Sequence, residues 1–214
     1  EHAGCTVLPE SKPQHIESMN ITPYIGKVTE WFQKIEKPEL TPVAEEIIAI
    51  RNLNFSYVPE QPVLKNINFS IHRGEMVSIV GKNGAGKTTL SNLICGFLIP
   101  DSGRIYLNGT DIAGLSIKER GEKIGLVMQN PNQMISKPMI FDEVALGLMV
   151  RGVSEAEIKE RVYDALRICG LYSFRNWPVS ALSFGQKKRV TIASILVMNP
   201  DILILDEPTA GQDY

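Results

Sequence analysis

The sequence has few cysteines and no apolar run long enough to cross a bilayer. Three cysteines occur among 214 residues, and no two of them form a C-x-x-C pair. This spacing does not suggest a disulfide framework, so we expect free thiols in a reducing compartment. No apolar stretch approaches the roughly 20 residues that a membrane-spanning helix needs, and no signal-peptide pattern is visible. We therefore expect a soluble chain located in the cytoplasm.

An excess of charge of one sign is also missing. The chain has 22 Lys and Arg residues against 24 Asp and Glu residues, which gives a formal net charge of −2. This balance provides no general attraction to nucleic acid or to an anionic membrane, so we expect no nucleic-acid partner. The hydrophobic share of 43% is that of an ordinary globular protein, and the length allows one good-sized core with a smaller lobe.

A glycine-rich turn carries the first recognisable chemistry. Gly81, Gly86, Lys87 and Thr88 fit the pattern G-x-x-x-x-G-K-[ST], and residues 76–80 before them are predicted to form a buried strand. Glycines let successive backbone N–H groups face a phosphate, Lys87 would reach the β- and γ-phosphates, and the Thr88 hydroxyl would ligate Mg²⁺. The alternative is a chance turn between strand and helix, which the flanking strand and the lysine disfavour. We expect the nucleoside triphosphate to contact Asn83, Gly84, Ala85, Gly86, Lys87, Thr88 and Thr89.

Two acidic residues follow an apolar segment near the end of the chain. Four apolar residues in "ILILDEP" place Asp206 and Glu207 at the carboxyl end of a predicted buried strand, where open α/β sheets bind ligands. Asp206 would hold Mg²⁺, usually through water, and Glu207 would polarise the attacking water. The alternative is an exposed turn with two acids. The phosphate loop upstream favours the catalytic interpretation.

The segment "LSFGQKKR" predicts a second helix start that suits an anion. Ser183 can cap the helix and Gly185 allows close approach of a backbone, so this N-terminus is also suited to phosphate. One γ-phosphate hardly needs two such sites from a single chain, whereas two chains placed head to tail could each supply one. Taken alone, the segment is equally explained as an ordinary capped helix.

Strand-like patterns precede and follow the phosphate loop. Residues 46–57 and 63–71 alternate apolar and polar side chains as half-buried strands do. Further strands are predicted at 102–112, with an Asn-Gly turn, at 123–129 and at 201–208.

The pattern becomes helical from about residue 130 to residue 176. Within it, Ser154 and Glu157 predict a capping box, and Gly170 predicts a helix end. The fold predicted from these elements is an α/β P-loop NTPase with a mainly parallel core sheet, an antiparallel β subdomain and an inserted helical lobe at about 130–190.

The first 46 residues differ from the rest. Residues 1–20 are polar and without pattern, as a linker is, whereas apolar residues recur at spacings of four and three from Ile21 to Ile35 and predict one amphipathic helix at about 22–36. This helix could pack on its own domain or dock on a partner. We expect residues 1–46 to be a linker and residues 47–214 to be the ATPase domain, within a longer polypeptide.

Three ordered motifs resemble those of a known family. "GKNGAGKT", "LSFGQ" and "ILILDEP" resemble the Walker A, signature and Walker B motifs of ATP-binding cassette (ABC) ATPases, over roughly residues 47–214. The resemblance implies that Tyr57 stacks on adenine and that Gln129 contacts Mg²⁺ and the attacking water. It also implies that ATP bound by an opposite domain contacts Ser183, Gly185 and Gln186, and that residues 210–213 form the D-loop at the dimer interface.

Finer details are similar to the ATPases of energy-coupling factor importers. "QNPNQ", "SFGQKKR" and "DEPTAG" are typical of that group, which imports vitamins or transition-metal ions such as cobalt and nickel and includes tandem proteins with two cassettes. The resemblance implies ATP and Mg²⁺ as cofactors, a second ABC ATPase domain in a head-to-tail dimer, integral membrane transporter subunits, and a peripheral position at the cytoplasmic face of the membrane. The chain would be the second cassette of a tandem protein. The alternative is a soluble ABC ATPase that acts on ribosomes or DNA, although such proteins usually carry basic extensions or coiled-coil inserts.

Two features depart from the family pattern. Phe184 stands where the signature L-S-G-G-Q has a glycine, and we expect it to be tolerated because the ring can point away from the ligand. The switch histidine of the family is expected beyond residue 214, because none of the three histidines present matches its position.

Overall fold

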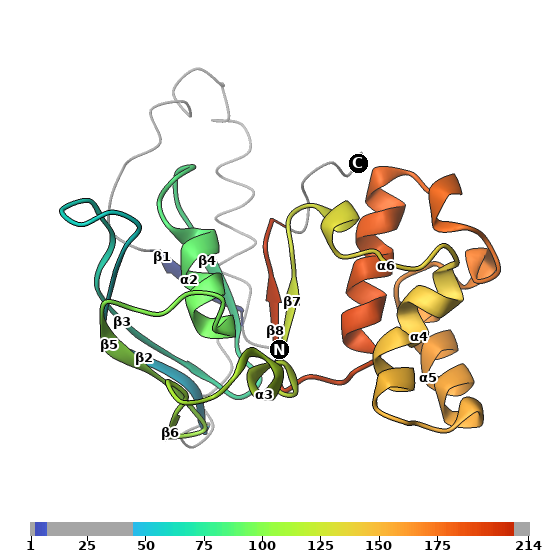
Figure 1. Cartoon of the computed structure of the whole chain (residues 1–214), viewed down its shortest axis with the longest axis horizontal. Helices are drawn as coiled ribbons and strands as arrows, with labels where there is room; N and C mark the ends of the chain where they lie inside the picture. Colours follow the sequence, from blue (N-terminus) through green and yellow to red (C-terminus); the bar gives the residue numbers. More distant parts are fainter. Residues whose placement is uncertain (1–2, 8–44, 208–214) are drawn as a thin grey trace, which may run out of the picture. The chain divides into compact units, whose positions relative to one another are not determined.

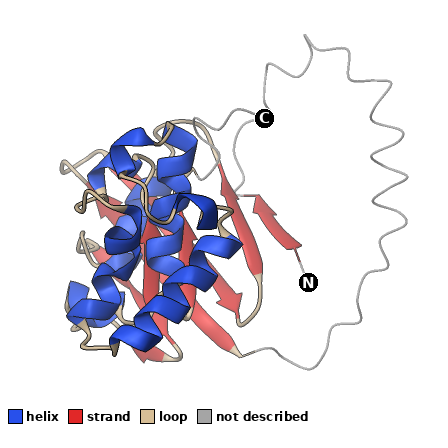
Figure 2. Ribbon diagram, turned by 90° about the vertical axis from the view of Figure 1, so that its right-hand side faces the viewer, coloured by secondary structure: helices blue, strands red, loops and turns tan. Residues whose placement is uncertain are grey.

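The computed structural model describes the backbone of residues 3–7 and the full residues 45–207 (Figure 1). These residues form two compact units, which we describe separately. The first unit contains the described residues up to 87 together with 100–112, and the second contains 88–99 and 113–207. Strands and helices both occur along the chain (Figure 2), which confirms the predicted α/β class.

The first unit is built around a four-stranded antiparallel sheet. Its strands are β2 (Glu46–Ser56), β3 (Pro62–His72), β5 (Ser102–Leu107) and β6 (Thr110–Asp111), in the order β3-β2-β5-β6. The central strand β2 is the most buried, because it has a neighbour on each side. The antiparallel β subdomain is thereby confirmed, and its buried apolar residues include Ile48, Ile50, Leu53, Phe55, Leu64, Ile105 and Leu107.

Four asparagines replace ladder bonds where the pairing of β2 and β3 is irregular. The register shifts between Ile50 and Leu53. There, Asn52 donates its N–H to the Asn68 side-chain oxygen at 2.8 Å, and Asn66 donates its N–H to the Asn54 side-chain oxygen at 2.8 Å. Asn52 and Asn66 have φ values of 50° and 47°, a left-handed conformation that asparagine tolerates better than most residues. An asparagine side chain of each strand thus accepts a backbone N–H of the other strand near this shift.

A parallel pair of strands completes the first unit. β1 (Ala3–Val7) pairs with β4 (Met76–Val80) in the register Ala3↔Met76 to Val7↔Val80. β1 lies within the segment for which we predicted a patternless linker. Its five residues carry no alternation from which a strand could be predicted, and its partner is remote in sequence. The strand β4 is confirmed, but its predicted burial is not. Met76 is 70% exposed and Val80 is 62% exposed.

The second unit contains another parallel pair and the helix after the phosphate loop. β7 (Ile124–Val127) pairs with β8 (Ile202–Leu205), and α2 (Lys87–Cys95) and α3 (Ile117–Gly121) precede them in sequence. We predicted that β8 would be wholly buried, but its residues alternate between half-buried and exposed, with Leu205 41% exposed. Within the described residues each parallel strand has a single partner, so its side chains are less covered than those of a central strand in a larger sheet.

Three helices form the predicted helical lobe. α4 (Ile140–Val150), α5 (Glu155–Ile168) and α6 (Phe184–Leu196) lie side by side, in yellow to orange in Figure 1. Short 3₁₀ turns occur at Pro131–Gln133, Tyr172–Phe174 and Val179–Ala181. The shared apolar core includes Ile140, Val144, Leu148, Val162, Leu166, Leu171, Val190 and Ala193.

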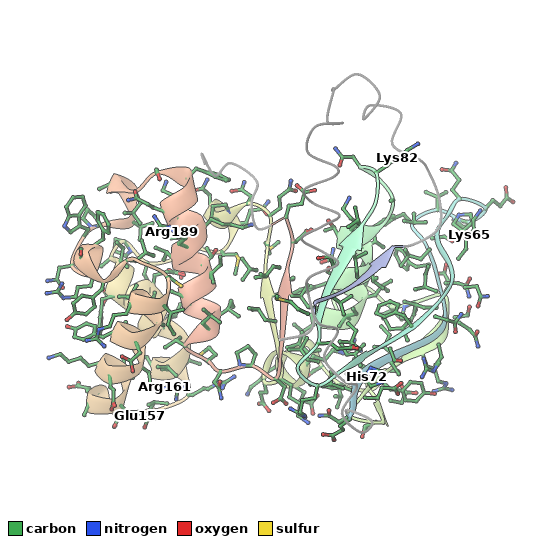
Figure 3. The ribbon with its side chains drawn as sticks, turned by 180° about the vertical axis from the view of Figure 1, so that it is seen from behind. Lys65, His72, Lys82, Glu157, Arg161 and Arg189 are labelled. Atoms are coloured by element: carbon green, nitrogen blue, oxygen red, sulfur yellow. The ribbon has the colours of Figure 1, made fainter. Side chains whose placement is uncertain are left out.

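The ends of α5 follow the sequence signals, with one difference. Ser154 caps the helix by accepting the Glu157 N–H, and Gly170 (φ 65°) ends it. The Leu171 N–H bonds to the Leu166 carbonyl at 2.7 Å and the Gly170 N–H to the Arg167 carbonyl, which is a Schellman motif. The predicted reciprocal half of the capping box is not formed, because the Glu157 carboxylate pairs instead with Arg161 one turn later, at 3.2 Å (Figure 3).

Two predicted segments lie outside the described residues: the helix at about 22–36 and the D-loop at 210–213. Among the helices of residues 45–207, none combines the length and the apolarity that a membrane span needs.

Replacing Gly103 with alanine should destabilise the protein. Gly103 has φ 88°, and a Cβ there would lie 2.3 Å from the Asn52 carbonyl oxygen. We expect the substitution to lower the free energy of unfolding by about 2 kcal/mol or more, measured by urea unfolding of the full-length protein. Gly114→Ala is the matched control, because a Cβ at Gly114 meets nothing within 4 Å. Equal stability of the two variants would contradict the close approach at Gly103.

Candidate nucleotide-binding site

The phosphate loop connects β4 to α2. Gly84 and Gly86 have φ values of 83° and 92°. A Cβ on Gly86 would lie 2.7 Å from Leu64 Cδ2 and 3.1 Å from Val63 Cγ1, so the start of β3 packs directly against the loop. Glycine at this position therefore meets two requirements, a left-handed backbone and a close neighbour.

Lys87 is the first residue of α2 and its side chain folds back over the loop. Its Nζ donates to the Gly81 carbonyl at 2.9 Å and to the Lys82 carbonyl at 3.1 Å. Lys82 is the second residue of the loop, and its side chain extends outward (Figure 3). The Lys87 ammonium is thus held above the backbone that the motif assigns to phosphate. The other predicted contacts divide by exposure: Asn83, Gly84 and Ala85 are exposed, whereas Thr89 is buried.

Tyr57 lies just after β2, in the same unit as the phosphate loop. Its ring is 60% exposed and meets the Phe55 ring edge-on, with centroids 4.9 Å apart and an interplanar angle of 88°. The hairpin that follows leads into Val63 and Leu64, the residues that contact Gly86. Phe55 thus supports a ring that still offers surface for stacking.

The second unit brings two pairs of predicted site residues together. The Thr88 hydroxyl donates to Asp206 Oδ2 at 2.9 Å, and Gln129 Nε2 donates to Glu207 Oε2 at 2.5 Å. The β7–β8 register explains the second pair. Val127 is paired with Leu205, so Gln129 and Glu207 each lie two residues beyond equivalent strand ends.

Glu207 has a backbone conformation that the sequence did not indicate. Its φ is 46°, in the left-handed region that non-glycine residues occupy at a cost of about 1–3 kcal/mol. The chain turns here immediately after Asp206, and the side chains of both residues are half-buried. Such strain is concentrated at functional sites.

Lys188 is the main polar residue of this region that sequence reasoning missed. Its side chain is 0% exposed, and Nζ donates to the carbonyls of Met128, Gln129 and Asp206 at 2.6, 2.9 and 3.2 Å. Burial lowers the pKa of the Lys188 ammonium, and the nearby carboxylates of Asp206 and Glu207 act in the opposite direction. The available sequence signal was its position four residues, about one helical turn, before Ile192, and this spacing alone does not distinguish a buried lysine from a surface one.

The start of α6 has the predicted capped geometry. The Ser183 hydroxyl accepts the Gln186 N–H at 3.2 Å, and Gln186 Oε1 accepts the Ser183 N–H at 2.9 Å, which completes a capping box. Phe184 is the first helical residue and is 41% exposed. A phenylalanine at the first position of a helix needs no left-handed backbone, so the glycine of the usual motif is not required here for conformation. Gly185 follows on the first turn.

The oxygen donors at Thr88 and Asp206 suit Mg²⁺. A hydroxyl and a carboxylate are hard ligands, and Mg²⁺ typically takes only one or two protein oxygens together with water and phosphate. Residues 45–207 contain no group of three or more His, Cys, Asp or Glu side chains that could hold a metal ion, so an all-protein metal cage is absent from this part of the chain. Thr88 and Asp206 together offer the one or two protein oxygens that such an ion takes.

Comparison with known proteins identifies the family to which this chain belongs. A family model described as "ABC transporter" matches residues 64–210, and a second described as "ATP-binding cassette cobalt transporter" matches residues 1–55. The second match covers the segment that we predicted as a linker. Putative ABC transporter ATP-binding proteins of Clostridium perfringens and Enterococcus faecalis are 53% and 54% identical over the whole chain. The chain spans 38% of the length of each of these relatives.

Solved structures are similar over most of the chain. The cbiO1 protein of Clostridium perfringens, described as part of the ABC transporter complex cbiONQ, matches with a TM-score of 0.74 and 42% identity, over 79% of this chain and 68% of that one. A dimeric ATP-binding cassette in a post-hydrolysis state with ADP and phosphate matches with a TM-score of 0.70 and 32% identity, over 78% of this chain and 76% of that one. The family model matches residues 64–210, which is more than half of the sequence. The chain therefore belongs to the ABC transporter family.

Proposed function

We propose that this chain binds ATP with Mg²⁺ and hydrolyses it to drive a membrane importer. The observation that carries the proposal is the pairing of Thr88 with Asp206 and of Gln129 with Glu207, because it groups oxygen donors for a cation with a carboxylate for water. Hydrolysis of ATP needs a cation site close to a group that activates water, and Asp206 and Glu207 are adjacent residues after β8.

Nucleotide binding is assigned to the phosphate loop and Tyr57. The N–H groups of Asn83 to Gly86 would cradle the phosphates, and Lys87 would exchange its two loop carbonyls for phosphate oxygens. The exposed Tyr57 ring would stack on the base. Thr88, Asp206 and Gln129 would hold Mg²⁺. When bound, Mg²⁺ offsets the negative charge of the phosphates.

The chain's own residues account for the hydrolytic step. Glu207 would accept a proton from water as the water oxygen bonds to the γ-phosphorus and the bond to the bridging oxygen breaks, which leaves ADP and phosphate. The Gln129 amide, 2.5 Å from the Glu207 carboxylate, would orient it and the water.

A second cassette is expected to complete the site. Ser183, Gly185 and Gln186 would contact ATP held by another ABC domain placed head to tail, with the capped N-terminus of α6 directed at its γ-phosphate. The dimeric cassette that resembles this chain supports the arrangement.

The relatives support a proposal for the transported cargo. Similarity to cbiO1 and to a family described as a cobalt transporter supports import of the energy-coupling factor type, for a transition-metal ion or a vitamin. The chain would act at the cytoplasmic face of the membrane, bound to integral membrane subunits. Nothing in the comparisons supports action on ribosomes or DNA.

Purification of the full-length protein from membranes of its own host tests the transport proposal. We expect integral membrane proteins to co-purify in mild detergent, among them a small subunit that binds a metal ion or vitamin. Recovery only from the soluble fraction, bound to ribosomes or DNA, would keep the ATPase and overturn the import.

Glu207→Gln should stop turnover and keep ATP binding. The amide fills the same space but cannot accept a proton, so we expect kcat to fall about 100-fold or more in a phosphate-release assay. Equilibrium binding of ATP should change little. Glu160→Gln on the exposed face of α5 is the control, and full hydrolysis by the Glu207 variant would remove Glu207 from the role of base.

Phe184→Gly should leave hydrolysis nearly unchanged. Because Phe184 is exposed at the first helical position, its ring is not required for the backbone of the signature segment. We expect kcat to stay within about threefold of the wild type. A large gain in turnover by the glycine variant would show that the ring obstructs the nucleotide.

A further inference from the structure

The Lys188 ammonium is fully satisfied by three backbone carbonyls. An ammonium has three N–H donors, and the carbonyls of Met128, Gln129 and Asp206 provide three acceptors at 2.6, 2.9 and 3.2 Å. A buried lysine without such partners would be strongly destabilising, so these contacts account for its place in the interior.

The three carbonyls belong to the two chain segments that carry the candidate catalytic groups. Met128 and Gln129 follow β7, and Asp206 follows β8. Gln129 and Asp206 contribute both their carbonyls to Lys188 and their side chains to the site. The Lys188 ammonium therefore holds the backbone of one member of each side-chain pair, Gln129 and Asp206.

We propose that Lys188 is a positioning residue that ties helix α6 to the backbone of Gln129 and Asp206 and so sets the geometry of the hydrolytic site. This inference rests on the proposed ATP hydrolysis. Lys188 does not touch the reacting atoms, and it acts through the residues whose carbonyls it holds.

The segment after Gln129 has a second point of attachment. The buried Glu143 carboxylate accepts the Ser136 N–H at 2.8 Å and the Lys137 N–H at 2.6 Å. Residues 130–135 thus lie between a fixed start at Lys188 and a fixed end at Glu143. Loss of Lys188 would free the start, where Gln129 meets Glu207, and leave the other end in place.

Lys188 also lies close to the signature-like segment at the start of α6. Lys188 lies five residues after Ser183 on α6. Because a helix of this length moves as a rigid element, a shift at its N-terminus would displace the three carbonyls together.

Lys188→Met tests the inference by removing the donors while keeping an apolar side chain of similar length. We expect kcat for ATP hydrolysis to fall about 10–100-fold with little change in KM, because Lys188 orients catalytic groups and does not itself contact the substrate. Lys188→Gln, whose amide still donates but reaches one atom less far, should restore part of the rate. Lys123→Met removes an exposed lysine of the same unit and should have no effect.

A double-mutant cycle separates positioning from simple loss of stability. If Lys188 acts by placing Gln129, then adding Lys188→Met to Gln129→Ala should cost much less than it costs alone. Additive losses, or an unchanged kcat in both Lys188 variants, would overturn the inference.

Hydrogen–deuterium exchange of the full-length protein without nucleotide supplies a readout independent of activity. We expect Lys188→Met, or Lys188→Gln if the first variant does not fold, to speed exchange in residues 128–135 and 203–207 but not at Ser136 and Lys137, which Glu143 holds, nor in α5. Unchanged exchange in these two segments would overturn the inference. A wild-type protein that hydrolyses no ATP would instead overturn the proposed function, whatever the exchange shows.

Discussion

The parallel pairing of β7 with β8 is the constraint on which the candidate site depends. Gln129 and Glu207 are 78 positions apart in sequence, yet their side chains are hydrogen-bonded. The pairing of Val127 with Leu205 and the bond from the Asp206 N–H to the Val127 carbonyl at 2.9 Å align the two strand ends. Because parallel strands end at the same edge, residues that follow them converge without any long side chain having to reach across.

Several cationic side chains of this molecule donate hydrogen bonds to backbone carbonyls. Lys87 is held by carbonyls of its own loop and Lys188 by carbonyls of two strand ends. Arg120, which is buried, donates to the carbonyls of Leu93 and Ile94 at 3.0 and 3.1 Å, at the end of α2. A cation there complements the partial negative charge of the helix end.

Local sequence signals predicted the parts of the site that are continuous in the chain. The glycines of the phosphate loop, the Ser183 cap and the acids after β8 each follow from the few residues around them, and the structure has each in the expected element. The helical lobe followed from its periodicity, and the antiparallel hairpin from its alternation. Roles in nucleotide binding and catalysis remain predictions.

What could not be predicted depends on partners that are distant in sequence. Strand β1 is specified by β4, not by its own five residues. The exposure of β4 and β8 depends on how many neighbours each strand acquires, which an apolar run does not encode. Lys188 would have been taken as a surface residue of α6, because its acceptors come from segments 18 and 60 positions away.

The left-handed backbone of Glu207 costs conformational stability at the position to which we assign the catalytic base. Asparagine or glycine would occupy φ 46° with less strain, so the fold by itself favours a residue that cannot serve as a base. Under the proposed role of Glu207 as the base, selection for turnover keeps a carboxylate at this position. In a cassette that binds ATP without hydrolysing it, replacement of this residue by asparagine or glycine would relieve the strain and make the protein more stable.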